Sequence, residues 1–167
     1  MPLELLLTEI ERRPPVRVPG TAVFLTSASE GAPVVLLHHL KHNKALHEQV
    51  VLLSVTAMAT PDVPEDERVT VTRLSQGFFR VTAAYGFMET PNVPEVLALA
   101  RAHGLQTRRM ETSFYLGRER VLHTGASKMA RWRKKVFIVM SRNAQSATHY
   151  FGLPPNRVVE LGAQVQL

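Results

Sequence analysis

The sequence predicts an α/β fold, in which helices pack on a mixed β-sheet that contains a parallel βαβ unit and an antiparallel hairpin. An apolar strand, a helix and a second apolar strand follow one another between residues 21 and 57, which is the order of a right-handed βαβ unit. Two alternating stretches, 68–75 and 78–87, indicate a hairpin because Gln76-Gly77 between them suits a tight turn. With 167 residues, 45% of them hydrophobic, the chain is large enough for one core.

The first element is a short amphipathic helix. Residues 3–12 carry leucines and an isoleucine at helical spacing, and Pro14-Pro15 ends the pattern. We expect this helix and a Pro-rich linker to occupy residues 1–16, ahead of a single domain over residues 17–167.

The βαβ unit begins with a strand at 21–27. The turn that follows has the chemistry of a helix start, with a serine for the N-cap and Pro33 for the first helical position. A helix is predicted over 34–47. The strand at 50–57 is continuously apolar, as expected of a strand buried on both faces.

The second half of the chain alternates helices and strands. A helix is predicted over 93–104, because Pro94 lies near its start and Gly104 follows its end. A strand follows at 112–123. An amphipathic helix is predicted over 127–144, then a short helix up to Phe151 and a final strand from Arg157.

Composition excludes several classes of protein. The absence of cysteine excludes a disulfide framework and agrees with a cytosolic setting. No segment approaches the run of about 20 apolar residues that a membrane helix needs, and Glu4, Glu9 and Glu11 interrupt what could have been a signal peptide. We therefore expect a soluble chain. Its net charge of +6 favours polyanionic neighbours: nucleic acid, nucleotides or an anionic membrane surface.

Four histidines, His38, His39, His42 and His47, lie close together in the predicted helix. His38 and His42 are four residues apart and could share one face of the helix toward a zinc ion. No third ligand or H-E-x-x-H pattern accompanies them, so we expect no metal site. The favoured interpretation is a helix that buries Leu36, Leu37 and Leu40 and points a polar, basic face outward. That outward face comprises His39, Lys41, His42 and Lys44.

No catalytic constellation is present. Nucleophile-elbow, P-loop and dinucleotide-binding patterns are all missing, and Glu89 in GFMETP is a lone carboxylate of the kind that caps or lies on the surface. We expect no enzymatic activity. The basic run around Trp132 lacks a nucleic-acid-reading motif, so a solvated helix face is favoured over nucleic-acid binding.

Five ordered motifs resemble one known family. The string LLHHLKHNKALHE at 36–48 is similar to the pattern LLHNLKHNKVLHE expected in the C-terminal region of Kup-type potassium uptake transporters (the KUP/HAK/KT family). Two departures are His39 where the family tends to have Asn, and the order Phe114-Tyr115. The other matching motifs are RVPGTAVF (17–24), YGFME with Pro91, Val93 and Pro94 (85–94), LGRE (116–119), and Met140 and RNA (142–144) followed by LPPNRVVELG (153–162).

The resemblance implies the cytosolic C-terminal domain of a bacterial potassium transporter, on the cytoplasmic face of the cell membrane. In that family, potassium:proton symport belongs to a transmembrane part that this chain lacks, and that part is the expected partner. The helix at residues 3–10 would then join the last membrane span to the domain and could lie along anionic lipid of the inner leaflet.

Two roles remain open, with a third ranked last. The first is regulation by an adenine nucleotide such as cyclic di-adenosine monophosphate, with no resident cofactor. Phosphate could be held where two turns precede helix N-termini, although ordinary capping is the commoner use of such turns. The second role is an assembly module that forms a homodimer. A free-standing nucleic-acid-binding protein is the third. The candidate ligand-binding residues are Ser27, Ser29, Gly31, Arg118, Gly125, Ser127, Lys128 and Arg131.

Overall fold

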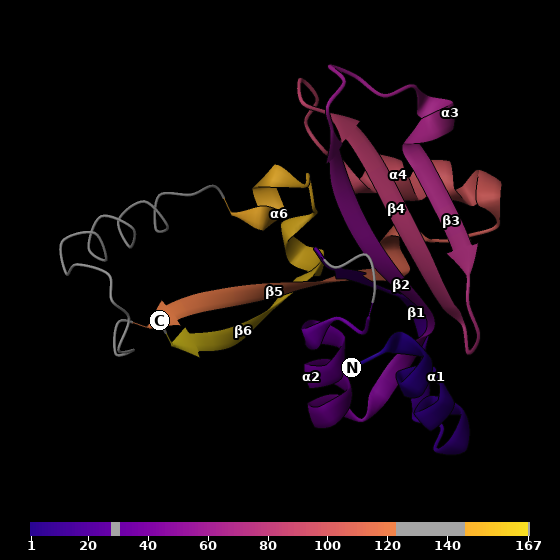
Figure 1. The fold of residues 1–167 in the computed structure, drawn as a ribbon. Coiled ribbons are helices and arrows are strands. Elements are labelled where there is room, and N and C mark those ends of the chain that lie inside the picture. The colour runs from indigo at the N-terminus through magenta and orange to yellow at the C-terminus, as the bar shows by residue number, and fades with distance from the viewer. Residues whose placement is uncertain (28–30, 123–145, 167) are drawn as a thin grey trace.

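A six-stranded sheet is the centre of the computed structural model, which describes residues 1–27, 31–122 and 146–166 (Figure 1). Its strand order is β3-β4-β2-β1-β5-β6. The β3–β4 pair is antiparallel, and the other four pairs are parallel. The predicted α/β class with a mixed sheet is confirmed. The strands are β1 (Val16–Leu25), β2 (Ala45–Met58), β3 (Val69–Arg73), β4 (Phe78–Gly86), β5 (Thr112–Leu122) and β6 (Val158–Gln166).

Helices cover both faces of this sheet. On one face α1 and α2 pack over residues such as Phe24, and on the other face α4 packs over residues such as Val23. Figure 1 also shows β5 and β6 extending away from the other strands. The α-helices are α1 (Leu3–Arg12), α2 (Val34–Asn43), α3 (Glu65–Arg68), α4 (Val93–Ala100) and α6 (Ala147–Tyr150). The 3₁₀ segments are η1 (Arg101–His103), η2 (Arg109–Glu111) and η3 (Pro155–Arg157).

The predicted amphipathic helix at the N-terminus is α1. It buries Leu3, Leu6 and Ile10 in the core cluster that also contains Leu36 of α2. Burying each such side chain contributes about 1.5–3 kcal/mol. The apolar side of α1 is therefore part of a core, while the expected domain boundary between residues 16 and 17 stays a prediction.

The βαβ unit β1–α2–β2 is parallel as expected, but its helix is shorter than predicted. α2 ends at Asn43, because Lys44 adopts the left-handed conformation (φ 53°) and its N–H donates to the carbonyl oxygen of Leu40. Such a cap usually requires glycine, so its sequence signal was missing here. His47 consequently lies in β2 and not in a helix.

The start of α2 also differs from the prediction. Its N-cap residue is Pro33, and no side chain caps the helix. The expected serine N-cap is therefore wrong. Pro33 still contributes, because its carbonyl oxygen accepts the N–H of Leu37 at 3.1 Å and closes the first turn.

The hairpin of β3 and β4 is confirmed, with Val71 opposite Val81. Both turn residues, Gln76 (φ 57°) and Gly77 (φ 74°), are left-handed, as a type I′ turn requires. The N–H of Phe78 donates to Ser75 O at 3.1 Å and closes the turn.

The second half of the chain follows the prediction where it is described. Asn92 caps α4 by accepting the N–H of Glu95, and Gly104 (φ 87°) follows η1. Both β5 and β6 form, and so does the short helix before Phe151. The predicted helix over 127–144 lies outside the described residues. None of the helices in the described ranges combines the length and apolar character that crossing a membrane requires.

Candidate functional site

The carboxyl end of β1 lies at a topological switch point of the sheet. The connection from β1 through α2 runs over one face to β2, whereas the connection from β4 through α4 runs over the other face to β5. β1 and β5 are parallel neighbours, with Phe24 opposite Tyr115. In open α/β sheets, ligands bind outside the carboxyl ends of the strands at such a point.

Three of the predicted ligand-binding residues can be placed relative to this edge. Ser27 is exposed two residues beyond the end of β1, and Gly31 (φ 88°) belongs to the turn before α2. Arg118 lies in β5, where its backbone is paired with Gly162 of β6. The sheet thus brings the strand before the first predicted turn beside the strand that carries Arg118. The other candidates, Ser29, Gly125, Ser127, Lys128 and Arg131, lie outside the described residues, and phosphate binding stays a prediction.

The structure differs from the prediction at two of the four histidines, because His47 lies in β2 and His39 is buried. His39 was expected to point outward, but it is only 6% exposed. Its ring meets Tyr115 at 4.7 Å and Phe24 at 5.6 Å between centroids, both edge-on. Its Nδ1 is 2.9 Å from the side-chain nitrogen of Asn43, which is a donor, so Nδ1 accepts. The orientation of α2 about its axis places His39, three residues after Leu36, on the side of the helix that faces the sheet.

Burial of this cluster keeps two histidines neutral. Burial lowers the pKa of His39, although a backbone hydrogen bond with Ala45 opposes the effect. Burial and repulsion from His39 lower the pKa of His47, whose ring centroid is 6.5 Å away. Within the described part of the chain, His47 Nδ1 is buried without a hydrogen-bond partner. Charging either ring would therefore be unfavourable in the folded protein.

His38 and His42 lie on the exposed side of α2. Their ring centroids are 6.2 Å apart. Among the residues that the structure describes, no group of three or more His, Asp or Glu side chains could hold a metal ion.

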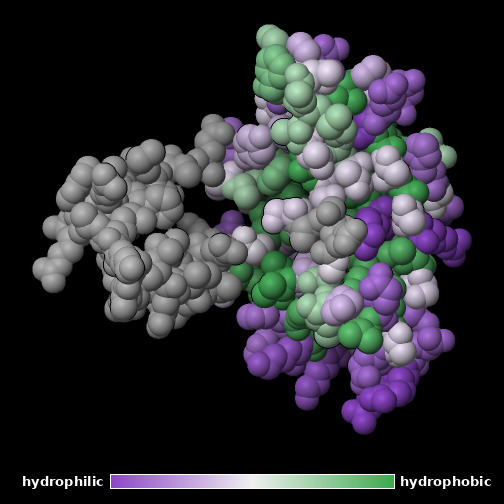
Figure 2. Space-filling view, in the orientation of Figure 1, coloured by the Kyte–Doolittle hydropathy of each residue, from purple (hydrophilic) through white to green (hydrophobic). Residues whose placement is uncertain are grey.

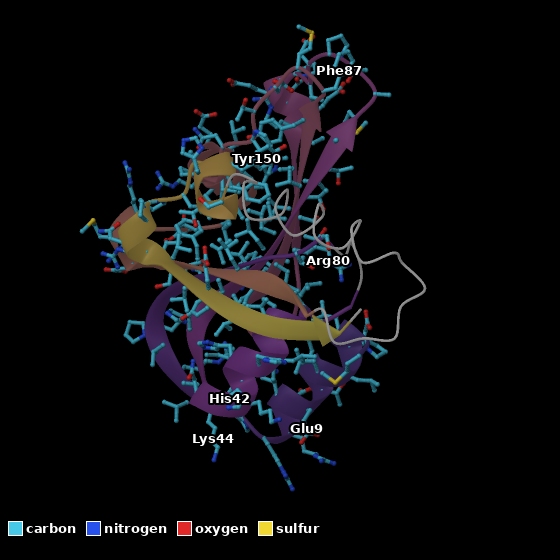
Figure 3. All side chains as sticks on the ribbon, turned by 90° about the vertical axis from the view of Figure 1, so that its left-hand side faces the viewer. Glu9, His42, Lys44, Arg80, Phe87 and Tyr150 are labelled. Carbon is cyan, nitrogen blue, oxygen red and sulfur yellow. The ribbon has the colours of Figure 1, made fainter. Side chains whose placement is uncertain are left out.

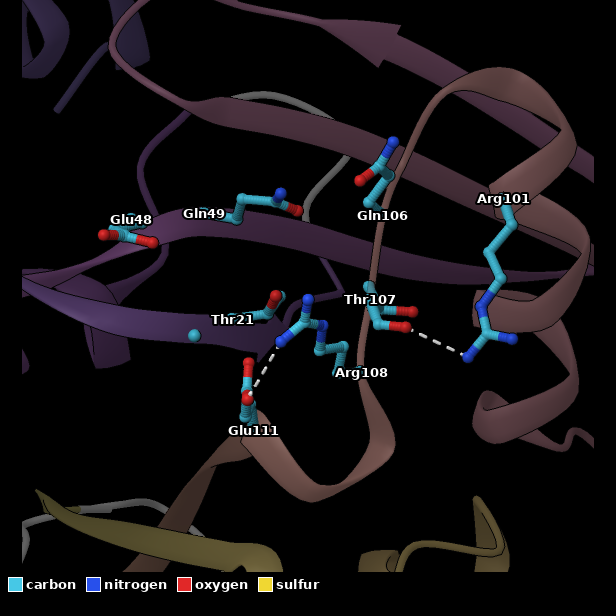
Figure 4. Close-up of a pocket in the computed structure, with 9 residues that line it drawn as sticks. Thr21, Glu48, Gln49, Arg101, Gln106, Thr107, Arg108 and Glu111 are labelled. Carbon is cyan, nitrogen blue, oxygen red and sulfur yellow. Dashed lines mark hydrogen bonds and ion pairs between the residues drawn. The ribbon is translucent and has the colours of Figure 1, made fainter.

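A polar cavity of about 490 Å³ opens near the amino end of β5 (Figure 4). Arg101 Nη2 donates to the carbonyl oxygen of Thr107 at 3.0 Å, and Arg108 Nη1 lies 3.4 Å from Glu111 Oε1. Sequence reasoning missed this cavity because its walls come from separate segments without a shared motif. The lining includes Thr21, Glu48, Gln49, Arg101, Gln106 and Arg108.

The chemistry of the cavity suits a small polar molecule. Gln49 Oε1 is buried and has no hydrogen-bond partner among the described residues. The Arg108–Glu111 pair is largely exposed, and such pairs contribute little stability. Arg108 could therefore exchange Glu111 for an anionic group at small cost. Gly20 (φ 102°) lets β1 approach Glu111 closely and shapes one wall.

Glu89, expected to cap or lie on the surface, joins two loops. Its Oε2 accepts the N–H of Gly86 at 2.7 Å and that of Val63 at 3.1 Å, and its Oε1 pairs with Arg68. The backbone hydrogen bond from Gly86 is the main cause that lowers the pKa of Glu89. This carboxylate is therefore charged and structural at neutral pH.

Comparison with known proteins identifies the family. The model of the K+ potassium transporter C-terminal domain matches residues 19–167. The chain belongs to this family. The resemblance seen in the ordered sequence motifs is thereby confirmed.

Relatives of this potassium transporter domain match it over its whole length. The chain is 59% identical to the probable potassium transport system protein Kup of Anaeromyxobacter sp. (strain Fw109-5), and 59% identical to that of Myxococcus xanthus (strain DK1622). It is 52% identical to the probable potassium transport system protein Kup 2 of Syntrophobacter fumaroxidans. In each comparison 100% of this chain covers 26% of the relative, so the chain spans about a quarter of their length. No solved structure matches it.

Proposed function

We propose that the chain is the cytosolic regulatory domain of a potassium transporter and catalyses no reaction itself. Potassium:proton symport is then the work of a membrane-spanning part of the same protein, and this domain controls that part. Two observations support the proposal. The relatives are named potassium transport proteins, and this chain corresponds to a quarter of their length. Its family model describes a C-terminal domain.

The regulator is an adenine nucleotide, such as cyclic di-adenosine monophosphate, bound at the carboxyl end of β1 and β5. The observation that carries this assignment is the switch point between these two strands, because β1 is followed by β2 on one side of the pair and β5 is followed by β6 on the other side. The phosphates would lie near Ser27 and Gly31 at the entrance to α2, where backbone N–H groups and the helix dipole favour an anion. Arg118 would supply a positive charge from the neighbouring strand.

A thermal-shift and calorimetric titration of the chain with adenine nucleotides tests this site. A ligand that binds only the folded state stabilises it by about 2.7 kcal/mol at 100 times its Kd. We expect cyclic di-adenosine monophosphate to raise the Tm, and Arg118→Gln to weaken this rise. Arg73→Gln is the matched control, because it removes an exposed arginine on β3, the outer strand on the opposite side of the described sheet from β5. No rise with any adenine nucleotide, or an equal rise in Arg118→Gln, would contradict the assignment.

Assembly of two copies is a second candidate function. β6 is the outermost strand on its side of the described sheet, and Val159 on it is 41% exposed. An edge strand presents unpaired backbone groups that can pair with another copy. Sedimentation equilibrium should then show a dimer that Val159→Lys weakens. A chain that stays monomeric at all concentrations would remove this alternative and leave the regulatory role untouched.

A further inference from the structure

The C-terminal ends of α1 and α2 lie together at one end of the molecule. α1 leads into β1 and α2 leads into β2, and the first residues of these two parallel strands, Val16 and Ala45, are partners in the sheet. Figure 3 shows Glu9 of α1 at the same end as Lys44, and Phe87 at the opposite end. The register of the strands thus brings together two helix ends that are distant in the sequence.

A groove with a volume of about 320 Å³ lies between these two helices. Leu6 and Ile10 line it from α1 and are buried, while Leu37 and Leu40 line it from α2 and are only half-buried. Ligand pockets in proteins typically measure about 300–1,000 Å³ and are mostly apolar. The groove therefore has the size and the lining to take a hydrocarbon chain. The remaining lining residues are Pro15 and the charged Glu9, Arg13 and Lys41.

The charged side chains beside the groove are predominantly basic. Arg13 and Lys41 are exposed, and neither forms an ion pair with any residue that the structure describes. The carboxylate in the lining is already paired, because Glu9 Oε2 lies 3.0 Å from Arg12 Nη2. Lys44 follows α2 directly and adds another exposed cation. An anion that approaches the groove therefore meets unpaired positive charge.

This positive charge is larger than the two helix ends need. Cations near a helix C-terminus offset the partial negative charge of the backbone, which is about half an elementary charge for each helix. Figure 2 shows hydrophilic side chains gathered at the lower end of the molecule, where Figure 1 places α1 and α2. The exposed charged residues at the ends of the two helices are the four cations Arg12, Arg13, Lys41 and Lys44 and the two carboxylates Glu9 and Glu11. Four positive and two negative charges leave an excess beyond that offset.

We propose that this groove binds an anionic phospholipid, with an acyl chain along Leu37 and Leu40 and the phosphate between Arg13 and Lys41. This inference rests on the proposed function, which places the domain beside a membrane. A soluble phosphate would meet the cations but leave the apolar lining in water, whereas a phospholipid covers both. The contact differs from a helix that lies flat on the membrane, because the apolar side of α1 faces the core.

Flotation of the chain with vesicles, in the absence of nucleotide, tests the role of charge. We expect binding to vesicles that contain phosphatidylglycerol, no binding to phosphatidylcholine alone, and weaker binding as the salt concentration rises. Each Lys or Arg near an anionic surface strengthens binding about five-fold, so Arg13→Gln with Lys41→Gln should weaken it about 25-fold. Arg101→Gln with Arg109→Gln is the matched control and should leave binding unchanged. These two exposed arginines follow α4, which packs on the other face of the sheet.

Methyl NMR with a spin-labelled lipid tests the role of the groove. Phosphatidylglycerol that carries a nitroxide on its acyl chain is added to the chain in bicelles. We expect the methyl signals of Leu37 and Leu40 to broaden. The methyl group of Met88 is the internal control and should stay sharp, because Met88 is 77% exposed and follows Phe87 at the opposite end of the molecule.

Several results would overturn the inference. They are the absence of binding to anionic vesicles, equal binding to neutral ones, and equal losses in the two double variants. Binding without broadening of Leu37 and Leu40 would also overturn it, because the cations alone would then meet the membrane. The nucleotide titration contains no lipid, so the proposed regulatory site stands or fails separately.

Discussion

The ring of His39 stands edge-on against Tyr115, with centroids 4.7 Å apart and planes inclined by 69°. Tyr115 in turn stacks on Phe24, with a centroid distance of 4.7 Å and an angle of 16°. A residue of α2 is thereby packed against adjacent strands β1 and β5, immediately below the switch point. The packing of this helix on the sheet depends on a histidine that remains uncharged.

Acidification should therefore destabilise the protein. Burial lowers the pKa of His39 and His47 in the folded state, while the unfolded chain keeps a value of about 6.5. The unfolded state then binds protons first as the pH falls. The free energy of unfolding should be constant above about pH 6.5 and decrease below it. Urea titrations from about pH 8 to pH 5 measure this dependence.

Two sets of variants separate the buried histidines from the exposed ones. His39→Phe should flatten the decrease below about pH 6.5, because one of the two buried titrating groups is gone. His38→Gln with His42→Gln should retain it, since both side chains are exposed. A decrease of the same size in His39→Phe and in the native chain would show that other groups cause it.

Replacing side chains of α2 by alanine should lower the free energy of unfolding more, the more deeply the side chain is buried. Leu36 is fully buried, so Leu36→Ala should lower the free energy of unfolding by about 2–5 kcal/mol. Leu40 is only half-buried and Leu40→Ala should cost less. Val34 is 60% exposed and serves as the control, with almost no loss for Val34→Ala. Equal losses at Leu36 and Val34 in urea unfolding would contradict the orientation of α2.

Two glycines with similar backbone angles should respond differently to alanine. Gly104 (φ 87°) has open space around it. Gly104→Ala should therefore lower the free energy of unfolding only by the cost of a left-handed alanine, about 1–2 kcal/mol. At Gly77 (φ 74°) an added Cβ would overlap the carbonyl oxygen of Glu48, so the hairpin must also move. Gly77→Ala should therefore be more destabilising in thermal unfolding. The opposite order would show that the hairpin turn does not press against β2.

Removing the charge of Glu89 should loosen the contact between the two loops that this side chain joins, at residues 60–63 and 86–89. Glu89→Gln loses the ion pair with Arg68 and weakens the acceptor for the N–H groups of Gly86 and Val63. Hydrogen exchange at these two amides should become faster. Glu48→Gln, a change at an exposed carboxylate in β2, is the control and should not alter them. Unchanged exchange in Glu89→Gln would mean that the backbone contacts of Phe87 and Met88 suffice.

Local features of the sequence determined the kinds of element and several of their ends. Gln76-Gly77 specified the hairpin turn because few residues adopt two successive left-handed conformations. Pro94 and Gly104 marked the start of α4 and the end of the turn that follows it. The apolar run at residues 50–57 predicted a strand buried on both faces; β2 lies between β4 and β1, and its residues 50–54 are buried, whereas Thr56 and Ala57 are exposed. The ordered family motifs are likewise a property of the sequence alone.

Tertiary structure decided what no short segment encodes. The end of α2 at Lys44 has no glycine signal, and β2 extends back to Ala45, where it pairs with Val16. The rotation of α2 about its own axis turned His39 inward, because its ring fills space against Tyr115 and Phe24 that only the assembled sheet creates. The placement of β5 beside β1 and the polar cavity depend on pairings between distant residues. Such pairings are selected by the packing of the whole core, and a local pattern of side chains cannot specify them.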